Sequence, residues 1–127
     1  MSAFNVAKFG GTSVANFDAM SRCAAIIENN PETKLVVSSA CSGVTNLLVE
    51  LANGVSNQEH RNEVLQNIAA IHDAILAKLN NSTETAAEVY KILDTATSLA
   101  EAASIQSSTK LTDHLVACGE LMSTHIL

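Results

Sequence analysis

The segment from Lys8 to Val14 reads KFGGTSV and contains the residue types of a polyphosphate-binding loop. Two adjacent glycines let backbone N–H groups approach phosphate oxygens closely, and a helix that begins after them adds N–H donors and the positive end of its dipole. Lys8 supplies a positive charge where negative charge builds up during phosphoryl transfer. The spacing fits neither a Walker A loop nor the GxGxxG loop of protein kinases. A solvated lysine followed by a tight glycine turn is the alternative, which the segment alone leaves open.

The alternating pattern of the predicted strand also indicates the surroundings of Lys8. Val6 and Lys8 fall on the same side of the predicted strand, which places the lysine in line with a residue expected in the core. Burying an unpaired ammonium group is costly, so we expect Lys8 to have an anionic partner, such as a ligand phosphate.

A second polar cluster spans Ser38 to Asn46 and follows a short apolar run. Ligands of parallel sheets bind beyond the carboxyl ends of the strands, so this loop and the glycine loop should flank one crevice. The hydroxyl groups of Ser39 and Thr45 could then hydrogen-bond a small polar substrate. The alternative is that Ser42 and Thr45 only cap the helix that follows.

A third segment, Gly119 to Ser123, lies inside a helical pattern. A glycine there costs about 1 kcal/mol relative to alanine, which suggests that Gly119 allows close approach to another backbone. Glu120 taken alone has the pattern of an ordinary surface glutamate.

Strand and helix patterns alternate in the first third of the chain. The run from Phe4 to Phe9 predicts a strand, the apolar spacing from Val14 to Ile27 predicts a helix, and Leu35 to Ser39 predicts a second strand that is buried on both faces. This order is typical of a βαβ unit with parallel strands.

The rest of the chain predicts helices. A short helix covers residues 47–51, and Ser56 with Glu59 has capping-box spacing for the next one. Two amphipathic helices joined by Asn80-Asn81-Ser82 suggest an αα-hairpin, and a last helix begins near Thr112. The apolar stripes are expected to pack within the chain or against a partner subunit; they comprise Val64, Ile68, Ile71, Ile75 and Leu79, then Val89, Leu93, Ala96, Ala100 and Ala103.

Composition excludes several classes of function. The 127 residues suffice for one domain, and 47% hydrophobic residues exclude a disordered chain. A net charge of −6 without a basic run argues against nucleic acid and anionic membranes as partners. No secretory signal or membrane-length apolar run is present, so a cytoplasmic location is expected. The three cysteines and four histidines have no metal-site spacing, which predicts free buried thiols and no metal site. His114 and Cys118 could share a helix face, but two ligands are weak evidence.

The chain ends at Ser123-Thr124-His125-Ile126-Leu127 without a helix stop signal, and two strands would make a small sheet. We therefore expect a truncated domain, cut inside a helix.

Together, these segments resemble the aspartokinases of the amino acid kinase superfamily. The family's opening signature is an apolar residue, any residue, Lys, Phe or Tyr, Gly-Gly, Ser or Thr, Ser or Cys, and an apolar residue; the segment from Val6 to Val14 satisfies it throughout. Glutamate 5-kinases and acetylglutamate kinases carry the lysine and a glycine turn but not the whole KFGGTS string. The Ser-Ala after the second strand, Thr45-Asn46 and the GELMS segment at 119–123 are similar to aspartokinases too. The monofunctional, lysine-sensitive bacterial class is the most similar.

The resemblance implies an α/β fold, in which residues 1–127 form the N-terminal part of a three-layer αβα (carbamate kinase-like) domain. Its sheet would be mostly parallel, and the chain helix-rich after residue 43. It implies phosphoryl transfer from ATP, bound with Mg²⁺, to L-aspartate, giving 4-phospho-L-aspartate in the first step of lysine, threonine and methionine biosynthesis. The alternatives are a superfamily member acting on glutamate or a nucleoside monophosphate, or a non-catalytic helical interaction module.

The resemblance also implies roles for particular residues. Lys8 would be catalytic and contact the ATP phosphates, Ser39 would lie near the reacting phosphoryl group, Thr45 would contact aspartate, and Glu120 would bind its amino group. The other ATP-binding residues would be Phe9, Gly10, Gly11 and Ser13. Aspartokinases are several times longer, and their nucleotide-base subdomain, an arginine, a catalytic aspartate and the ACT regulatory domains would lie beyond residue 127. We therefore expect the isolated chain to be inactive and the full-length enzyme to be a homo-oligomer.

Overall fold

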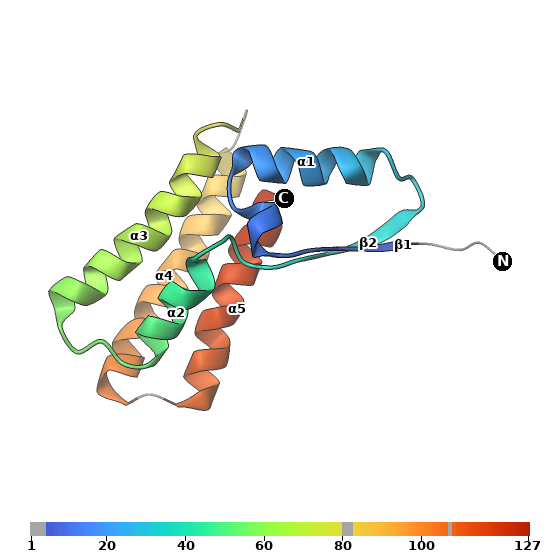
Figure 1. Ribbon diagram of the computed structural model, residues 1–127. Helices are drawn as coiled ribbons and strands as arrows, with labels where there is room; N and C mark the ends of the chain where they lie inside the picture. The colour runs from blue at the N-terminus through green and yellow to red at the C-terminus, as the bar shows by residue number, and fades with distance from the viewer. Residues whose placement is uncertain (1–4, 80–82, 107) are drawn as a thin grey trace.

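The computed structural model describes residues 5–79, 83–106 and 108–127. Strands β1 (Asn5–Phe9) and β2 (Thr33–Ser38) pair in parallel, and α1 (Phe17–Glu28) connects them, running back alongside the strands (Figure 1). The predicted βαβ unit is confirmed. Phe4, which was predicted to begin the first strand, lies outside the described residues.

The helix predicted to begin at Val14 instead starts three residues later. A 3₁₀ turn, η1 (Gly11–Val14), comes first, and the Asn16 side chain then caps α1 by accepting the Ala19 N–H at 2.9 Å. The Cys23 thiol donates to the Ser13 carbonyl at 3.1 Å, which ties α1 to this turn. The Asn16 cap, rather than the apolar spacing, determines where the helix begins, because its side chain accepts an otherwise unpaired N–H group.

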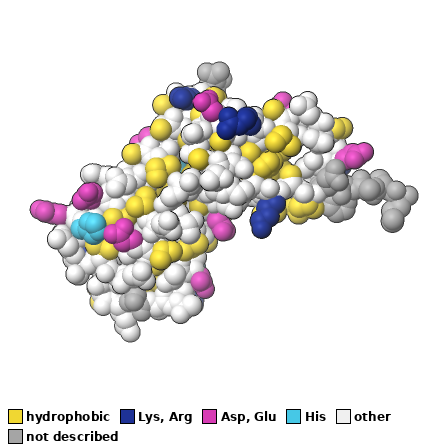
Figure 2. All heavy atoms as spheres, in the orientation of Figure 1, with side chains coloured by type: hydrophobic (Ala, Val, Ile, Leu, Met, Phe, Trp, Pro, Cys, Tyr) yellow, Lys and Arg dark blue, Asp and Glu magenta, His cyan; other side chains and the backbone are white. Residues whose placement is uncertain are grey.

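One face of the two-stranded sheet is open, and the prediction that β2 is buried on both faces is wrong. Leu35 is 54% exposed and Val37 44%. The register places them beside Val6, itself 54% exposed, and Lys8. No other part of the chain that the structure describes covers this face. The alternation of apolar residues along the strand therefore did not predict which side chains are buried. Figure 2 shows hydrophobic side chains exposed beside α1 and the strands.

Helices form the larger part of the described chain, as predicted after residue 43. They are α2 (Val44–Ala52), α3 (Gln58–Leu76), α4 (Thr83–Ile105) and α5 (Thr109–Ile126). Helix α5 begins at Thr109 rather than Thr112, because Ser108 caps it.

The helical core is built from the predicted stripes. Both long stripes are buried within the chain except for Ile71 and Leu79, which are half-buried, so the prediction of packing within the chain is confirmed. The predicted link Asn80-Asn81-Ser82 lies outside the described residues. The largest side chains that are fully buried include Leu48, Leu51, Ile68, Ile75, Leu115 and Met122.

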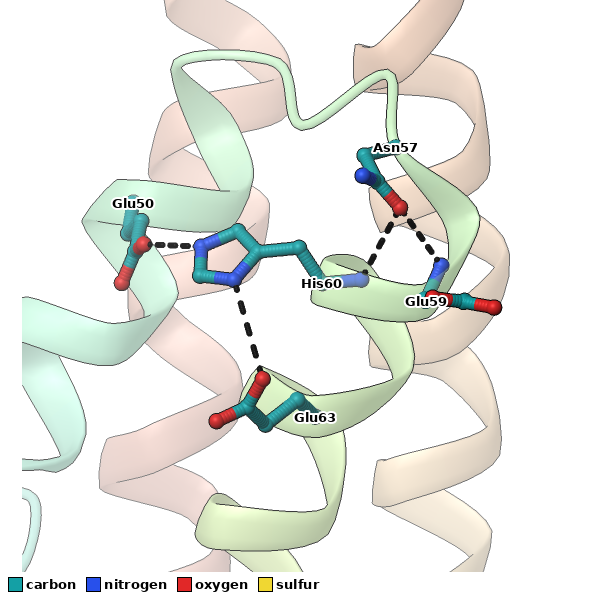
Figure 3. A network of polar contacts seen from close by, with 5 residues as sticks. All are labelled: Glu50, Asn57, Glu59, His60 and Glu63. Atoms are coloured by element: carbon teal, nitrogen blue, oxygen red, sulfur yellow. Dashed lines mark hydrogen bonds and ion pairs between the residues drawn. The ribbon is translucent and has the colours of Figure 1, made fainter.

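The start of α3 is capped one residue later than predicted (Figure 3). Asn57, rather than Ser56, accepts the N–H groups of Glu59 at 2.9 Å and His60 at 3.2 Å. The His60 ring nitrogen Nε2 lies 2.7 Å from the carboxylate of Glu50, which links α3 to α2.

We expect Asn57→Ala to lower the free energy of unfolding by about 1 kcal/mol, because two helix N–H groups lose their acceptor. Ser56→Ala is the matched control and should change it much less. Urea unfolding of both variants tests the assignment, and an equal loss in the two would contradict it.

His72 is a buried titratable side chain of the helical core. It is 0% exposed, and its Nδ1 lies 2.8 Å from the Ile68 carbonyl, so Nδ1–H donates there. Among the described residues Nε2 has no hydrogen-bond partner. Burial lowers the pKa of His72, although the Ile68 carbonyl and the Asp73 carboxylate oppose the shift. The neutral ring is therefore the folded form.

Acid should destabilise the chain through His72. Because the folded state binds this proton more weakly than the unfolded state, stability is complete above the unfolded pKa of about 6.5 and is lost as the pH falls below it. Urea unfolding at pH 7.5 and at pH 5.5 measures the loss. His72→Asn keeps a donor for Ile68 and should reduce the loss, whereas His114→Gln, which changes an exposed histidine, should leave it intact. An undiminished loss in His72→Asn would contradict the assignment.

The cysteines and His114 are the other side chains that were considered as possible metal ligands. Cys23, Cys41 and Cys118 are free and buried, as predicted. His114 is exposed, so it does not share a site with Cys118. The part of the chain that the structure describes contains no group of three or more His, Cys, Asp or Glu side chains arranged to hold a metal ion. None of its helices is long and apolar enough to cross a membrane.

Candidate functional site

The loops that follow β1 and β2 touch each other. The Ser39 N–H donates to the carbonyl of Phe9, the last residue of β1, at 3.0 Å and so joins the start of the second loop to the end of β1. A Cβ on Gly11 would lie 3.4 Å from the Ala40 carbonyl oxygen and 3.7 Å from the Ser42 Cα. The two loops therefore lie side by side at the carboxyl edge of the sheet, while the ligand-binding crevice between them stays a prediction.

The two glycines of the first loop differ in their surroundings. Gly11 lies against the second loop, where a side chain would meet backbone, whereas Gly10 is exposed with nothing within 4 Å of its missing Cβ. A ligand can therefore approach the backbone at Gly10 without obstruction. The Ser13 N–H already donates to the Gly10 carbonyl at 3.0 Å, so the hydroxyl group is the part of Ser13 left for a ligand. The Phe9 side chain is buried, which leaves its backbone at the loop.

Lys8 lies on the open face of the sheet, where the register pairs it with Val37. The expectation that it stands in line with a core residue is wrong, because Val6 is exposed as well. No carboxylate among the described residues forms an ion pair with Lys8. Its ammonium group is accessible for an external anion.

Thr45 lies in the first turn of α2 and is exposed. The cap of this helix is Gly43, with φ of +86° and no side-chain hydrogen bond. The alternative in which Ser42 or Thr45 caps α2 is therefore wrong. A positive φ is accessible to glycine at little cost, which explains the residue at this turn.

Gly119 lets α5 pack directly against the second loop and α2. A Cβ there would lie 3.0 Å from Ala40 Cβ, 3.1 Å from Val44 Cγ1 and 2.9 Å from Leu48 Cδ1. The predicted close approach is confirmed, but its partners are side chains and not another backbone.

Glu120 follows on the exposed side of α5, beside the end of β2. It lines a groove together with Val36, Val37, Ser38, Ala117, Leu121 and Thr124. The close packing at Gly119 thus brings the Glu120 carboxylate to the end of the strand that leads into Ser39.

We expect Gly119→Ala to destabilise the chain. Overpacking costs about 1–3 kcal/mol, while the better helix propensity of alanine offsets about 1 kcal/mol. Gly10→Ala is the matched control for stability, since its added methyl group would meet no atom within 4 Å. Thermal unfolding of the two variants tests this, and a Gly119→Ala variant as stable as the parent would contradict the packing.

Sequence reasoning missed Ser123 in this region. Its side chain is completely buried, and its Oγ lies 3.1 Å from the Oγ of Ser38. Its spacing of four residues from Gly119 was the available signal, since that places two small residues on one helix face.

Comparison with known proteins identifies the family of the chain. The model described as the amino acid kinase family matches residues 3–127. The chain belongs to this family.

Within the family, the chain is similar to aspartokinases, as its motifs predicted. It is 50% identical over 124 residues to the lysine-sensitive aspartokinase 3 of Escherichia coli (strain K12). This alignment covers 98% of this chain and 27% of that protein. It is 47% identical over 85 residues to the putative inactive aspartokinase 3 of Haemophilus influenzae, covering 67% of this chain and 69% of that one.

Solved structures agree. The crystal structure of E. coli aspartokinase III with lysine and aspartate (T-state) matches with a TM-score of 0.93 and 48% identity, over 97% of this chain and 27% of that chain. The structure with aspartate and ADP (R-state) matches equally well. The amino acid kinase fold is therefore confirmed, and this chain spans 27% of the length of the E. coli enzyme.

Proposed function

We propose that residues 1–127 form the N-terminal part of the catalytic domain of an aspartate kinase. The enzyme transfers the γ-phosphoryl group of ATP to the side-chain carboxylate of L-aspartate, giving ADP and 4-phospho-L-aspartate. The observation that carries this proposal is the meeting of three separate segments at one edge of the sheet. Gly11 lies against Ala40, the Ser39 amide binds the Phe9 carbonyl, and Gly119 packs α5 onto the same loop.

The phosphate side of the site uses the glycine loop. Lys8 stabilises the negative charge of the transferring group, and the backbone of Gly10 and Gly11 provides N–H donors, with the surface unobstructed at Gly10. The hydroxyl groups of Ser13 and Ser39 and the backbone of Phe9 complete the nucleotide contacts in this proposal. Structures of the E. coli relative with ADP support nucleotide use by this family.

The aspartate side uses Thr45 and Glu120. Glu120 is the counter-ion of the substrate amino group, and Thr45 hydrogen-bonds the substrate from the first turn of α2. The acceptor carboxylate is already ionised at neutral pH, so no general base is required. Catalysis by this part of the enzyme then consists of positioning and charge stabilisation.

Mg²⁺ fits this scheme as part of the nucleotide complex. The described residues offer no carboxylate cluster for a metal, while the phosphates of ATP supply oxygen ligands of the kind that Mg²⁺ prefers. We also propose a cytoplasmic location, where free ATP and L-aspartate meet, and a homo-oligomeric full-length enzyme.

A second candidate is a non-catalytic relative of aspartokinases. The alignment with the H. influenzae protein covers similar shares of the two chains, so that protein, named as putative inactive, is about as short as this one. The helical core is buried within the chain, which would let this part serve without catalysis.

A hybrid enzyme distinguishes the two candidates. In it, this chain replaces the aligned segment of the E. coli lysine-sensitive aspartokinase 3. ADP release is measured with aspartate, with glutamate, with a nucleoside monophosphate and without acceptor. The unaltered E. coli enzyme and the 127-residue chain alone are the controls.

We expect the hybrid enzyme to release ADP in response to aspartate and the chain alone to be inactive. A hybrid that melts cooperatively but shows no response to aspartate would reject the proposal and favour the non-catalytic candidate. A response to another acceptor in place of aspartate would also reject it.

A further inference from the structure

A buried polar contact joins β2 to α5 across 85 residues of sequence. Ser123 is 0% exposed and its Oγ lies 3.1 Å from the Oγ of Ser38, the last residue of β2. The Ser38 hydroxyl also donates to the Ser39 carbonyl at 3.2 Å. Since a hydroxyl carries a single proton, Ser123 must then be the donor to Ser38.

Ser38 is therefore the hydrogen-bond partner of the completely buried Ser123 hydroxyl group. A buried polar group that loses its partner is costly, so these two side chains depend on one another.

The contact lies beside the residues proposed to bind aspartate. Ser123 is one helical turn from Gly119, which packs on Ala40 and Val44, so this face of α5 contacts the segment after β2 at Ser38, Ala40 and Val44. Glu120 and Ser38 line the same groove. The position of the Glu120 carboxylate relative to Ser39 is thus determined by how α5 is seated on this segment.

We infer that Ser123 is a positioning residue for aspartate binding: through its hydrogen bond to Ser38 it sets the distance between Glu120 and the segment that carries Ser39 and Thr45. This inference rests on the proposed function. It concerns a side chain that does not itself reach the substrate.

A double-mutant cycle in the hybrid enzyme tests the inference kinetically. Ser123→Ala should raise the KM for aspartate about fivefold, the equivalent of one lost hydrogen bond, and leave the KM for ATP unchanged. Ser38→Ala should act similarly, and the double variant should be no worse than either single one, because the partners share one contact. Ser123→Cys, which keeps a buried hydrogen-bonding group, should recover part of the loss. Ser98→Ala, at an exposed serine of α4, is the matched control.

Amide hydrogen exchange supplies a readout that does not need activity. In Ser123→Ala and in Ser38→Ala, the amides of residues 120–126 should exchange faster, while those of α3 should be unchanged. Unchanged exchange at 120–126, additive effects in the double variant, or equal rises in both KM values would overturn the inference. If the parent hybrid lacks turnover with aspartate, the proposed function fails, while faster exchange would still support the link between β2 and α5.

Discussion

Replacing Lys8 by alanine in the hybrid enzyme is expected to lower turnover with aspartate about a hundredfold or more, the loss typical of one missing charge-stabilising donor. Lys8 is accessible at the carboxyl end of β1 and has no ion-pair partner among the described residues, so its charge is available to the phosphates. Its removal should leave the fold intact, because the side chain is exposed and is not part of the hydrophobic core. Steady-state kinetics and thermal unfolding measure the two effects.

The matched control for Lys8 is Lys34→Ala, which removes an exposed lysine near the opposite end of the neighbouring strand. We expect it to change turnover little. Lys8→Arg, which keeps the charge but alters its geometry, should fall between the parent and the alanine variant. Turnover of Lys8→Ala within about threefold of the parent, well short of that expected loss, would remove Lys8 from the proposed mechanism.

Glu120→Gln in the hybrid enzyme is expected to raise the KM for aspartate at least about tenfold, because a charge-assisted hydrogen bond to the substrate amino group becomes a neutral one. The KM for ATP should not change, since the carboxylate lies beside β2 on α5 and not on the glycine loop. Kinetics with each substrate varied in turn separate the two constants.

Glu101→Gln serves as the control, since Glu101 is an exposed glutamate of α4. It should leave both constants unchanged. An unaltered KM for aspartate in Glu120→Gln would show that Glu120 is an ordinary surface residue that does not bind the substrate.

Most helices and the βαβ unit were predictable because their patterns are local. The stripe that includes Val89 and Ala96 repeats at helical spacing, and the short β-branched run ending at Ser38 has the composition of a strand. The precise helix starts were less predictable, because several polar residues competed as caps. Asn16 and Asn57 prevailed by reaching N–H groups with a short side-chain carbonyl.

Burial on the sheet was not predictable from alternation. Leu35 and Val6 have the residue types of core positions, yet whether a face is covered depends on which elements pack over it, and none of the described elements covers theirs. An anionic partner of Lys8 was expected because of that burial. Lys8 is instead exposed, and its exposure makes the ammonium group accessible to the ATP phosphates.

The residues of the candidate site were found from motifs, and the parallel strands predicted that the first two loops lie together, but the contacts that α5 makes with them were not predicted. The contact of Gly11 with Ala40 and the packing of Gly119 on Val44 join segments that are far apart in sequence. The hydrogen bond between Ser38 and Ser123 spans 85 residues and has no local signature. Such contacts follow only from the packing of α5 against the βαβ unit.

The three buried cysteine thiols allow local unfolding of this chain to be measured by chemical labelling. Thiolates are the species that alkylating reagents attack, and burial both blocks access to these thiols and raises the pKa of each. Cys23 lies on α1 of the βαβ unit, whereas Cys118 lies on α5 in the helical core. The labelling rates of Cys23 and Cys118 therefore measure how often the βαβ unit and the helical core open, respectively. Comparing the two rates shows whether these two parts unfold as one cooperative unit or separately.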